Sequence, residues 1–259
     1  MKKLFACLLA VTVALSAAGC QKKEEPMDVF KKAAEKNAEL DSIDMTSSMN
    51  MTMAMGENSL DFGTDMDVKM SGASSDDLKY YAETSTNIMG TSLNMTMFYT
   101  DGYYYLDMEG DKMKYAMDIE TMMEEAEKAG IDTVEADWIS EISMEESGDD
   151  KILTFTADPA KMDSYVQELL GASGAFDELA DSGMTIESVS GVYTVGKDGY
   201  YKDMKLDMTF KMTVEGTEVE MTVSMDAVIN NPGQPVTVEI PSTDCLLYTS
   251  PSPRDRQKS

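Results

Sequence analysis

The chain of 259 residues contains no histidine, and its three cysteines lie near its two ends. Without histidine it lacks the commonest general base, the commonest metal ligand and the usual partner of a catalytic serine. No cysteine stands between Cys20 and Cys245, which excludes a disulfide, a thiolate metal site and a cysteine nucleophile from that stretch. An enzyme would depend on carboxylate pairs, and no pair stands out among 48 acidic residues. We therefore expect a protein that is not an enzyme and that carries no cofactor.

Long hydrophobic runs are also missing, apart from one at the N-terminus. There "MKK" precedes "LFACLLAVTVALS", an apolar run too short to span a bilayer as a stable helix. "SAAGC" follows and ends at Cys20, which resembles the lipobox of bacterial lipoprotein signal peptides, with Ala17 in place of the usual leucine. The sequence thus predicts a signal peptide over 1–19, a diacylglycerol on Cys20, and an anchor and linker over 20–26. An ordinary secretory signal with an incidental cysteine is the alternative.

Arginine is nearly absent, and both arginines lie in the last segment, "CLLYTSPSPRDRQKS" at 245–259. This segment breaks with the acidic, methionine-rich pattern before it, and it resembles the translation of a transposase adapter used in sequencing libraries. We interpret 245–259 as a non-native tail, with a disordered natural tail as the alternative. The folded part is then a single domain over 27–244, long enough for a substantial core.

Basic residues are few, 21 against 48 acidic ones, which gives a formal net charge of −27. Such a surface is repelled by nucleic acid and by anionic lipid headgroups, so we expect no nucleic-acid partner. Membrane attachment would then come from the acyl chains on Cys20, at the extracellular face of the cell membrane. The acidity is typical of a solvated outer face that keeps a secreted protein soluble, and binding of cations or of a basic partner is the alternative.

Methionine is abundant, with 25 residues, and much of it alternates. In "MTSSMNMTMAMG" (45–56) and "MKLDMTFKMTV" (204–214), apolar side chains occupy most of the alternate positions. An alternation of period two is typical of strands with one apolar and one wet face, and about ten such strands can be traced. "YTDGYYYLDM" adds a hairpin signal with Asp101-Gly102 at the turn, and "VTVEIP" (236–241) predicts a final edge strand.

Helical spacing and capping residues predict about four short helices, over 27–40, 118–130, 158–171 and 174–180. Strands that alternate cleanly do not fit a doubly wound parallel sheet, whose strands are apolar on both faces. We therefore predict an α+β fold in which a large curved antiparallel sheet, an unclosed half β-barrel, wraps around a few helices.

The lipobox, the N-terminal helix, the strands rich in methionine and aromatics, and the mid-chain helices together resemble the LolA/LppX-type lipoprotein-carrier fold. The stretch "YTDGYYYLDMEGDKMKYAMD" (99–118) is similar to a "DGYYY…G-K" stretch in uncharacterised lipoproteins of Gram-positive anaerobes. The resemblance covers most of 27–240, and it implies an apolar cavity that can take lipid acyl chains. It transfers no individual ligand residue, because no diagnostic position matches.

Three interpretations of the methionines are open. They could simply fill the core, they could line a cavity that accepts varied apolar ligands, or their thioethers could bind Cu(I) or Ag(I). The second interpretation carries the functional hypothesis, and no metal ligand is assigned. The candidate ligand-binding residues are then Met51, Met53, Phe62, Met66, Met95, Met97, Met208, Phe210, Met221 and Met225.

The leading hypothesis is a monomeric, non-enzymatic, membrane-anchored lipoprotein that binds or carries a hydrophobic small molecule, in particular a lipid. The alternative is a structural or signalling module of the cell envelope, with a filled core, that recognises another protein through its acidic outer face. The carrier hypothesis requires the sulfur-bearing side chains to share one face and to be sheltered from bulk water.

Overall fold

The structure is a computed structural model, and it describes residues 24–56, 58–73, 75, 77–116, 134–162, 184–214 and 216–243. Several predicted features lie outside the described residues: the signal peptide, the acylated Cys20, the helices at 118–130 and 174–180, most of the helix at 158–171, and the tail.

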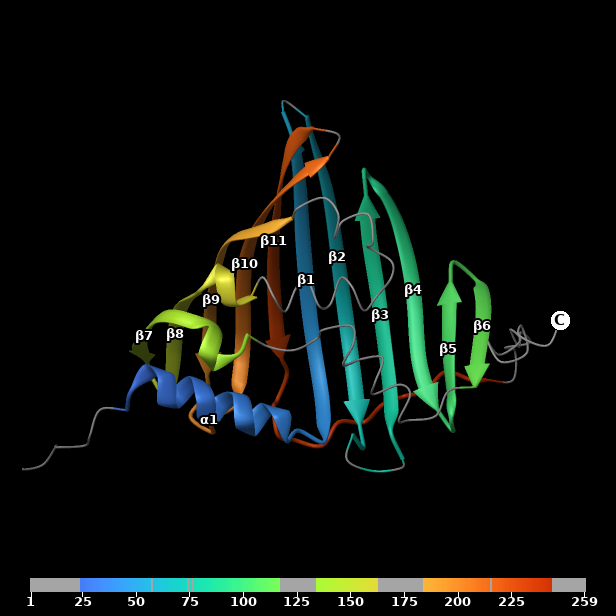
Figure 1. Cartoon of the computed structure of the whole chain (residues 1–259). Coiled ribbons are helices and arrows are strands. Elements are labelled where there is room, and N and C mark those ends of the chain that lie inside the picture. The colour runs from blue at the N-terminus through green and yellow to red at the C-terminus, as the bar shows by residue number, and fades with distance from the viewer. Residues whose placement is uncertain are drawn as a thin grey trace, which may run out of the picture.

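Eleven strands form one antiparallel sheet in the order β6-β5-β4-β3-β2-β1-β11-β10-β9-β8-β7 (Figure 1). The strands are β1 (Ser42–Met55), β2 (Asn58–Ser71), β3 (Lys79–Ile88), β4 (Thr91–Thr100), β5 (Tyr103–Met108), β6 (Asp111–Ala116), β7 (Ile139–Ser147), β8 (Asp150–Ala157), β9 (Thr185–Val195), β10 (Tyr201–Val214) and β11 (Thr217–Ile229). Two meanders, β1 to β6 and β7 to β11, are joined where the first strand pairs with the last. Since β6 and β7 are opposite edges, the sheet is large, antiparallel and unclosed, as predicted.

The described part of the chain is mainly β-structure. α1 (Pro26–Ala38) is an α-helix, residues 159–162 are also α-helical, and a short 3₁₀ helix, η1 (Ala136–Trp138), precedes β7. Pro26 occupies the first turn of α1, where its missing N–H costs nothing. Val29, Phe30 and Ala33 are buried, so the apolar stripe of α1 includes Phe30, as the helical spacing predicts. In Figure 1, α1 lies across the lower ends of β7 to β10.

The register of the strands assigns every strand residue to one of two faces, because residues directly opposite in antiparallel strands share a face. The ring of Phe30 in α1 contacts the rings of Phe155, Tyr193 and Tyr201. We call the face that carries these three rings the inner face, and the opposite one the outer face. Tyr193 pairs with Met204, so the alternate positions of β10 that begin at Met204 also belong to the inner face.

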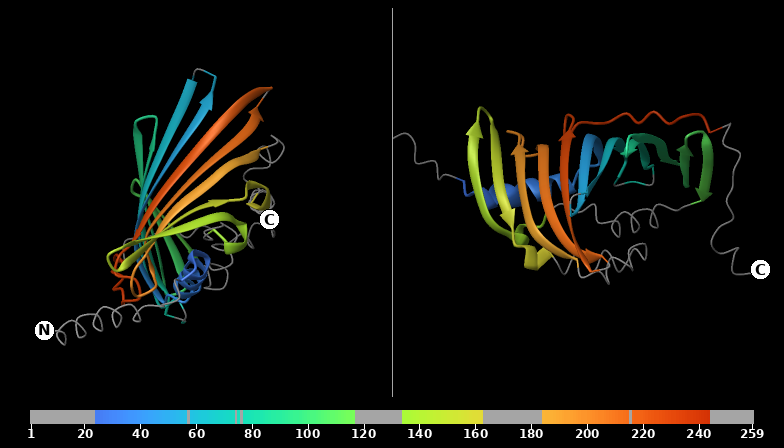
Figure 2. Two further views of the ribbon diagram at one scale, coloured as in Figure 1. Left: turned by 90° about the vertical axis from the view of Figure 1, so that its left-hand side faces the viewer. Right: turned by 90° about the horizontal axis from the view of Figure 1, so that it is seen from above.

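The predicted edge strand at 236–241 is wrong. Residues 231–243, here called the strap, form no strand and run from the end of β11 behind β1 to β4, toward β5 (Figures 1 and 2). Val236, Val238 and Ile240 are half-buried, whereas Thr237 and Glu239 are exposed. The alternation that suggested a strand therefore reflects side chains that pack on the outer face, without backbone pairing in the sheet.

Candidate site for a hydrophobic ligand

The register places all ten predicted ligand residues on the inner face. Met51 lies between Phe62 of β2 and Val223 of β11, and Met53 pairs with Met221. The same ladders extend to β4 and β10, where they include Met66, Met95, Met97, Met208, Phe210 and Met225. The alternation in the sequence thus predicted a common face, and the binding of a ligand by this face stays a prediction.

These side chains belong to a larger surface, which we call the methionine face: the inner-face positions of β1 to β4, of β10 from Met204 onward, and of β11. No position of the methionine face carries a charged side chain, although 27% of the residues in the chain are charged. Charged side chains of the same strands, such as Asp65 and Lys205, alternate onto the outer face. The surface can therefore accept apolar groups but offers no ionic partner.

Burial of the candidate residues is graded. Phe210 is 6% exposed and packs in the core, whereas Met225 is 38% exposed. The other eight candidates are half-buried. Met225 lies directly opposite Met49, which is also 38% exposed, so two thioethers meet at a water-accessible part of the face. A surface that is sheltered but only partly covered fits a site for an apolar ligand better than a close-packed core does.

The part of the inner face under α1 is different, because aromatic rings fill it. Ring centroids of Phe155 and Tyr193 lie 5.0 Å apart, and those of Tyr193 and Tyr201 lie 5.2 Å apart, all nearly perpendicular. The Tyr201 hydroxyl donates a hydrogen bond of 3.2 Å to the carbonyl oxygen of Phe30. Burial raises the pKa of Tyr193 to about 12 and raises the pKa of Tyr201 further, with the neighbouring Tyr193 adding to the effect. This aromatic half is a packed core and leaves no room for a ligand.

Gly191 shows how tight the aromatic half is. It is the inner-face residue opposite Phe155, whose ring lies over the glycine. A Cβ atom on Gly191 would lie 2.3 Å from Cζ of Phe155, so no larger residue fits there unless the ring moves. The glycine thus lets the ring approach the backbone of β9.

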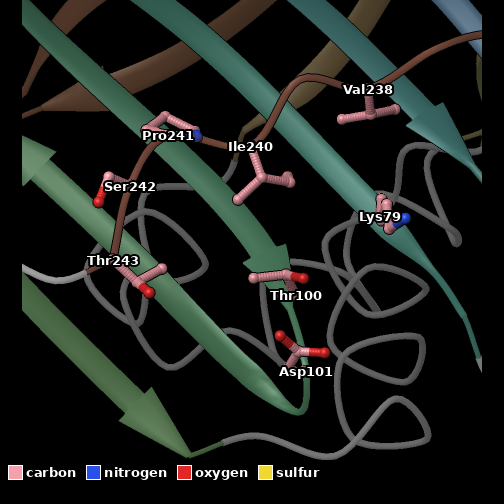
Figure 3. A pocket seen from close by; sticks show the side chains of 8 residues that line it. All are labelled: Lys79, Thr100, Asp101, Val238, Ile240, Pro241, Ser242 and Thr243. Carbon is pink, nitrogen blue, oxygen red and sulfur yellow. The ribbon is translucent and has the colours of Figure 1, made fainter.

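The described residues also form an open pocket of about 410 Å³ on the outer face. It is lined by Lys79, Thr100 and Asp101 of the sheet and its turns, and by residues of the strap (Figure 3). The strap residues in the lining are Val238, Ile240, Pro241, Ser242 and Thr243. The pocket lies on the side opposite the methionines and is largely polar, so it does not correspond to the predicted apolar cavity. That cavity stays a prediction.

On β5 and β6, three apolar inner-face residues were missing from the candidate ligand-binding residues. Leu106 pairs with Met97 and with Met113, and Met108 pairs with Met95. Leu106, Met108 and Met113 are half-buried and extend the methionine face onto β5 and β6. The alternation of Leu106 and Met108 with charged or aromatic neighbours was the signal that could have found them.

Two searches for other kinds of site concern the described residues alone. Within them, no three histidine, cysteine or carboxylate side chains gather as a possible metal site. No helix in that part of the chain combines the length and the hydropathy that crossing a bilayer requires. Neither finding bears on thioether ligands, so binding of Cu(I) or Ag(I) through methionines stays an alternative.

The strand order and the apolar inner face define the chain as an unclosed antiparallel half-barrel with one lipophilic surface. The chain belongs to the DUF6612 family, a family of unknown function, whose profile matches residues 25–243. No curated protein matches the chain.

Solved structures to which the chain is similar include LprF from Mycobacterium bovis, at 12% identity and a TM-score of 0.46, with 84% of this chain and 97% of that one covered. They include a LolA superfamily protein from Nitrosomonas europaea, at 8% identity and a TM-score of 0.26, covering 80% and 94%. A putative outer membrane lipoprotein-sorting protein domain from Vibrio parahaemolyticus is similar at 9% identity and a TM-score of 0.24, covering 79% and 92%. A protein of the LolA superfamily is thus among the similar structures, as the sequence resemblance predicted.

Proposed function

We propose that this protein is a membrane-anchored extracellular lipoprotein that binds or carries a hydrophobic molecule, in particular a lipid, and that it acts without catalysis. The observation that carries the proposal is the methionine face, a continuous inner surface without charge whose ten candidate residues are mostly half-buried. The names of the similar structures, a LolA superfamily protein and a lipoprotein-sorting domain, are consistent with it.

The chemistry of the methionine face indicates which part of a ligand it would hold. An apolar chain gains from transfer out of water, at about 0.8 kcal/mol per buried methylene. Methionine side chains are unbranched and polarizable, and they adapt to ligands of different shape. Because the face offers no ionic partner, a charged headgroup would stay outside it. The proposed ligand is therefore an acyl chain or a similar hydrocarbon, bound with little selectivity for its shape.

The first described residues lie beside α1 and β8. Glu24, four residues after Cys20, accepts one hydrogen bond from Nζ of Lys151 in β8, and its Oε1 lies 3.6 Å from Nζ of Lys32 in α1. The Lys151 hydrogen bond, followed by its charge, lowers the pKa of Glu24. We propose that acylated Cys20 and the linker over 20–26 attach a single domain, residues 27–244, to the outer face of the cell membrane as a monomer.

A lipid-binding experiment tests the proposal with a matched pair of variants. Met97 of β4 is half-buried on the inner face, and its neighbour Thr96 is half-buried on the outer face. Met97→Lys places a positive charge in the methionine face. Thr96→Lys places the same charge opposite the carboxylates of Glu83 and Asp107, which attract it. We expect Met97→Lys to weaken binding of the neutral fluorophore N-phenyl-1-naphthylamine about tenfold or more, and Thr96→Lys to leave it unchanged.

Mass spectrometry of the gently purified wild-type chain completes the test. Co-purifying lipid that is depleted in Met97→Lys supports the proposal, provided that circular dichroism shows both variants folded. A wild-type chain that carries no lipid and binds no fluorophore would remove it.

The alternative function, a protein-binding module of the envelope with a filled core, is favoured by one observation. The aromatic half under α1 is fully packed and could serve as a scaffold for an acidic outer face. Cross-linking in cells separates the two functions. One stoichiometric protein partner, together with a lipid-free interior, favours the module.

A further inference from the structure

Half of the large apolar side chains that are exposed in the described part of the chain lie at one end of the molecule. Five of them lie on the ends of two adjacent hairpins, β1–β2 and β3–β4, and are between 39% and 76% exposed. We call this group the apolar tip; it consists of Met55, Leu60, Ile88, Met89 and Leu93. In Figure 1 both hairpin ends point upward, away from α1.

The apolar tip is continuous with the methionine face. Leu60 lies opposite Met53, and Ile88 lies opposite Phe62 on the next strand pair. Leu93 of β4 pairs with Thr86 of β3, which is two residues before Ile88 and shares its face. An apolar molecule could therefore pass from the tip to Met53 and Phe62 without crossing a charged side chain.

Charge is absent from most of β1 and from the end of the β3–β4 hairpin, which carry four of the five tip residues; the fifth, Leu60, lies on β2 between Glu57 and Asp61 in the sequence. No charged residue occurs from Met45 to Gly56 or from Thr84 to Thr100, in a chain in which 27% of the residues are charged. A surface built to meet a protein usually keeps a polar rim, and on so acidic a chain that rim would carry charge. A lipid interface, in contrast, penalises charged side chains and accepts uncharged polar and apolar ones.

Two turns at the same end of the sheet have the same backbone conformation but different side chains. Both the β3–β4 and the β5–β6 turns have two central residues with positive φ: Met89 (52°) and Gly90 (84°), and Glu109 (53°) and Gly110 (95°). In each turn the glycine N–H donates to a side-chain oxygen three residues earlier, that of Asn87 at 3.0 Å or Asp107 at 2.9 Å. The backbone is thus built alike, but the β3–β4 turn is uncharged and apolar where the β5–β6 turn is acidic.

Met89 is therefore not required by the turn. A left-handed backbone suits Gly, Asn and Asp better than methionine, and this methionine is 76% exposed to water. A residue that is unfavourable in its backbone conformation and unfavourable in water gains only if something apolar covers it. An apolar surface at the end of the hairpin would do so.

We propose that the apolar tip contacts the interfacial region of a lipid bilayer and is the place where a hydrophobic ligand passes between that bilayer and the methionine face. The passage of ligand rests on the proposed function, whereas the contact with lipid does not. The tip would place the uncharged end of the β3–β4 hairpin in the headgroup boundary, while Glu57 and Asp61 of the β1–β2 hairpin and the acidic outer face stay in water.

Tryptophan fluorescence tests the contact. The test uses the chain without the predicted signal peptide (1–19). Cys20→Ser prevents acylation, Trp138→Phe removes the one native tryptophan, and Met89→Trp places a single new one. The matched control is Asp101→Trp, at the other end of β4, where Asp101 (φ 51°) and Gly102 (φ 75°) form a turn with the same two positive φ angles. With neutral phosphatidylcholine vesicles, we expect a blue shift of the emission for Met89→Trp and none for Asp101→Trp.

A second variant separates this proposal from the proposed function. Met89→Glu copies the residue at the corresponding position of the β5–β6 turn, so the backbone can accept it. We expect the partition of the chain onto phosphatidylcholine vesicles to fall about tenfold. Binding of N-phenyl-1-naphthylamine in solution should stay as in the wild type, because Met89 lies in the turn and outside the methionine face.

The outcomes are distinct. No blue shift at position 89, an equal shift at position 101, or unchanged partition of Met89→Glu would overturn the tip proposal. A Met89→Glu chain that changes its oligomeric state without vesicles would overturn it in favour of a second copy as the partner. Loss of fluorophore binding in every chain, with vesicle contact intact, would remove the proposed function and leave the contact standing.

Discussion

The aromatic half under α1 and the methionine face over β1 to β4 are two parts of the inner face that are built from different kinds of side chain. Under α1, rings of Phe30, Phe155, Tyr193 and Tyr201 meet in edge-on and stacked geometries with fixed spacings. Over β1 to β4, unbranched methionines stand half-buried side by side. Aromatic rings have few rotatable bonds and specific contact geometries, whereas methionine has three rotatable bonds and tolerates many arrangements. The comparison suggests that one half holds the sheet in shape and the other half remains adaptable.

The largest expected effect concerns the centre of the aromatic half. Phe30 is 1% exposed and contacts three rings, so Phe30→Ala should lower the free energy of unfolding by about 3–5 kcal/mol. Met66, half-buried in the methionine face, is the matched truncation, and Met66→Ala should cost about 1–2 kcal/mol. Urea unfolding followed by circular dichroism measures both. Equal losses would contradict the division into a packed and an adaptable half.

A smaller effect is expected from adding one methyl group to the aromatic half, with Gly63 on the outer face of β2 as the control position. Gly191→Ala forces the ring of Phe155 to move, which should destabilise the chain by about 1–3 kcal/mol. At Gly63 of β2 the nearest atom to an added Cβ is Oδ1 of Asn50, at an ordinary 3.5 Å. Gly63→Ala should therefore be neutral or stabilise by about 0.5 kcal/mol, through a less flexible unfolded chain. The same unfolding experiment serves, and a Gly191→Ala chain as stable as the wild type would mean that the ring moves freely.

The smallest effect is a pH dependence that belongs to the aromatic half. The pKa of Tyr193 is raised by burial to about 12, from about 10 in an unfolded chain. The folded chain then keeps a proton that the unfolded chain loses, so stability is intact below pH 10 and falls as the pH rises from 10 to 12. Tyr193 should contribute about 2 kcal/mol or less to this loss, and Tyr193→Phe should remove that contribution. Unfolding curves between pH 9 and pH 12 measure it; an unchanged slope in Tyr193→Phe would assign the alkaline sensitivity to another group.

The sequence predicted which side chains share a face of the sheet. It did not predict which elements pack over each face. Alternation of period two reports which side chains share a face, which is why Met51, Met95 and Met208 could be assigned together. It does not report what lies over that face. The aromatic half depends on where α1 docks, and Phe30 meets Phe155 and Tyr193 only through contacts between segments distant in the chain.

The strap also shows that an alternation of apolar residues does not establish how a segment packs. Val236, Val238 and Ile240 alternate with exposed residues as they would in a strand, yet the segment has no partner strand in the sheet. Prolines at 232, 235 and 241 lack the backbone N–H groups that hydrogen bonding in a sheet requires. They were the sequence feature that argued against a strand. The apolar tip was likewise hidden, because exposure at the end of a hairpin depends on the lengths of neighbouring strands.

The pairing of β1 with β11 has a consequence for how the protein is made. These strands lie near opposite ends of the described chain, and Met45 pairs with Ile229. Contacts between such remote segments form slowly, because the chain loses the entropy of a long loop before the strand pairing contributes any stabilisation. While the chain folds, the meander that begins with β1 has no neighbour on its other side until β11 is available to pair with it. The apolar inner face is therefore most prone to aggregation just before the last strand pairs.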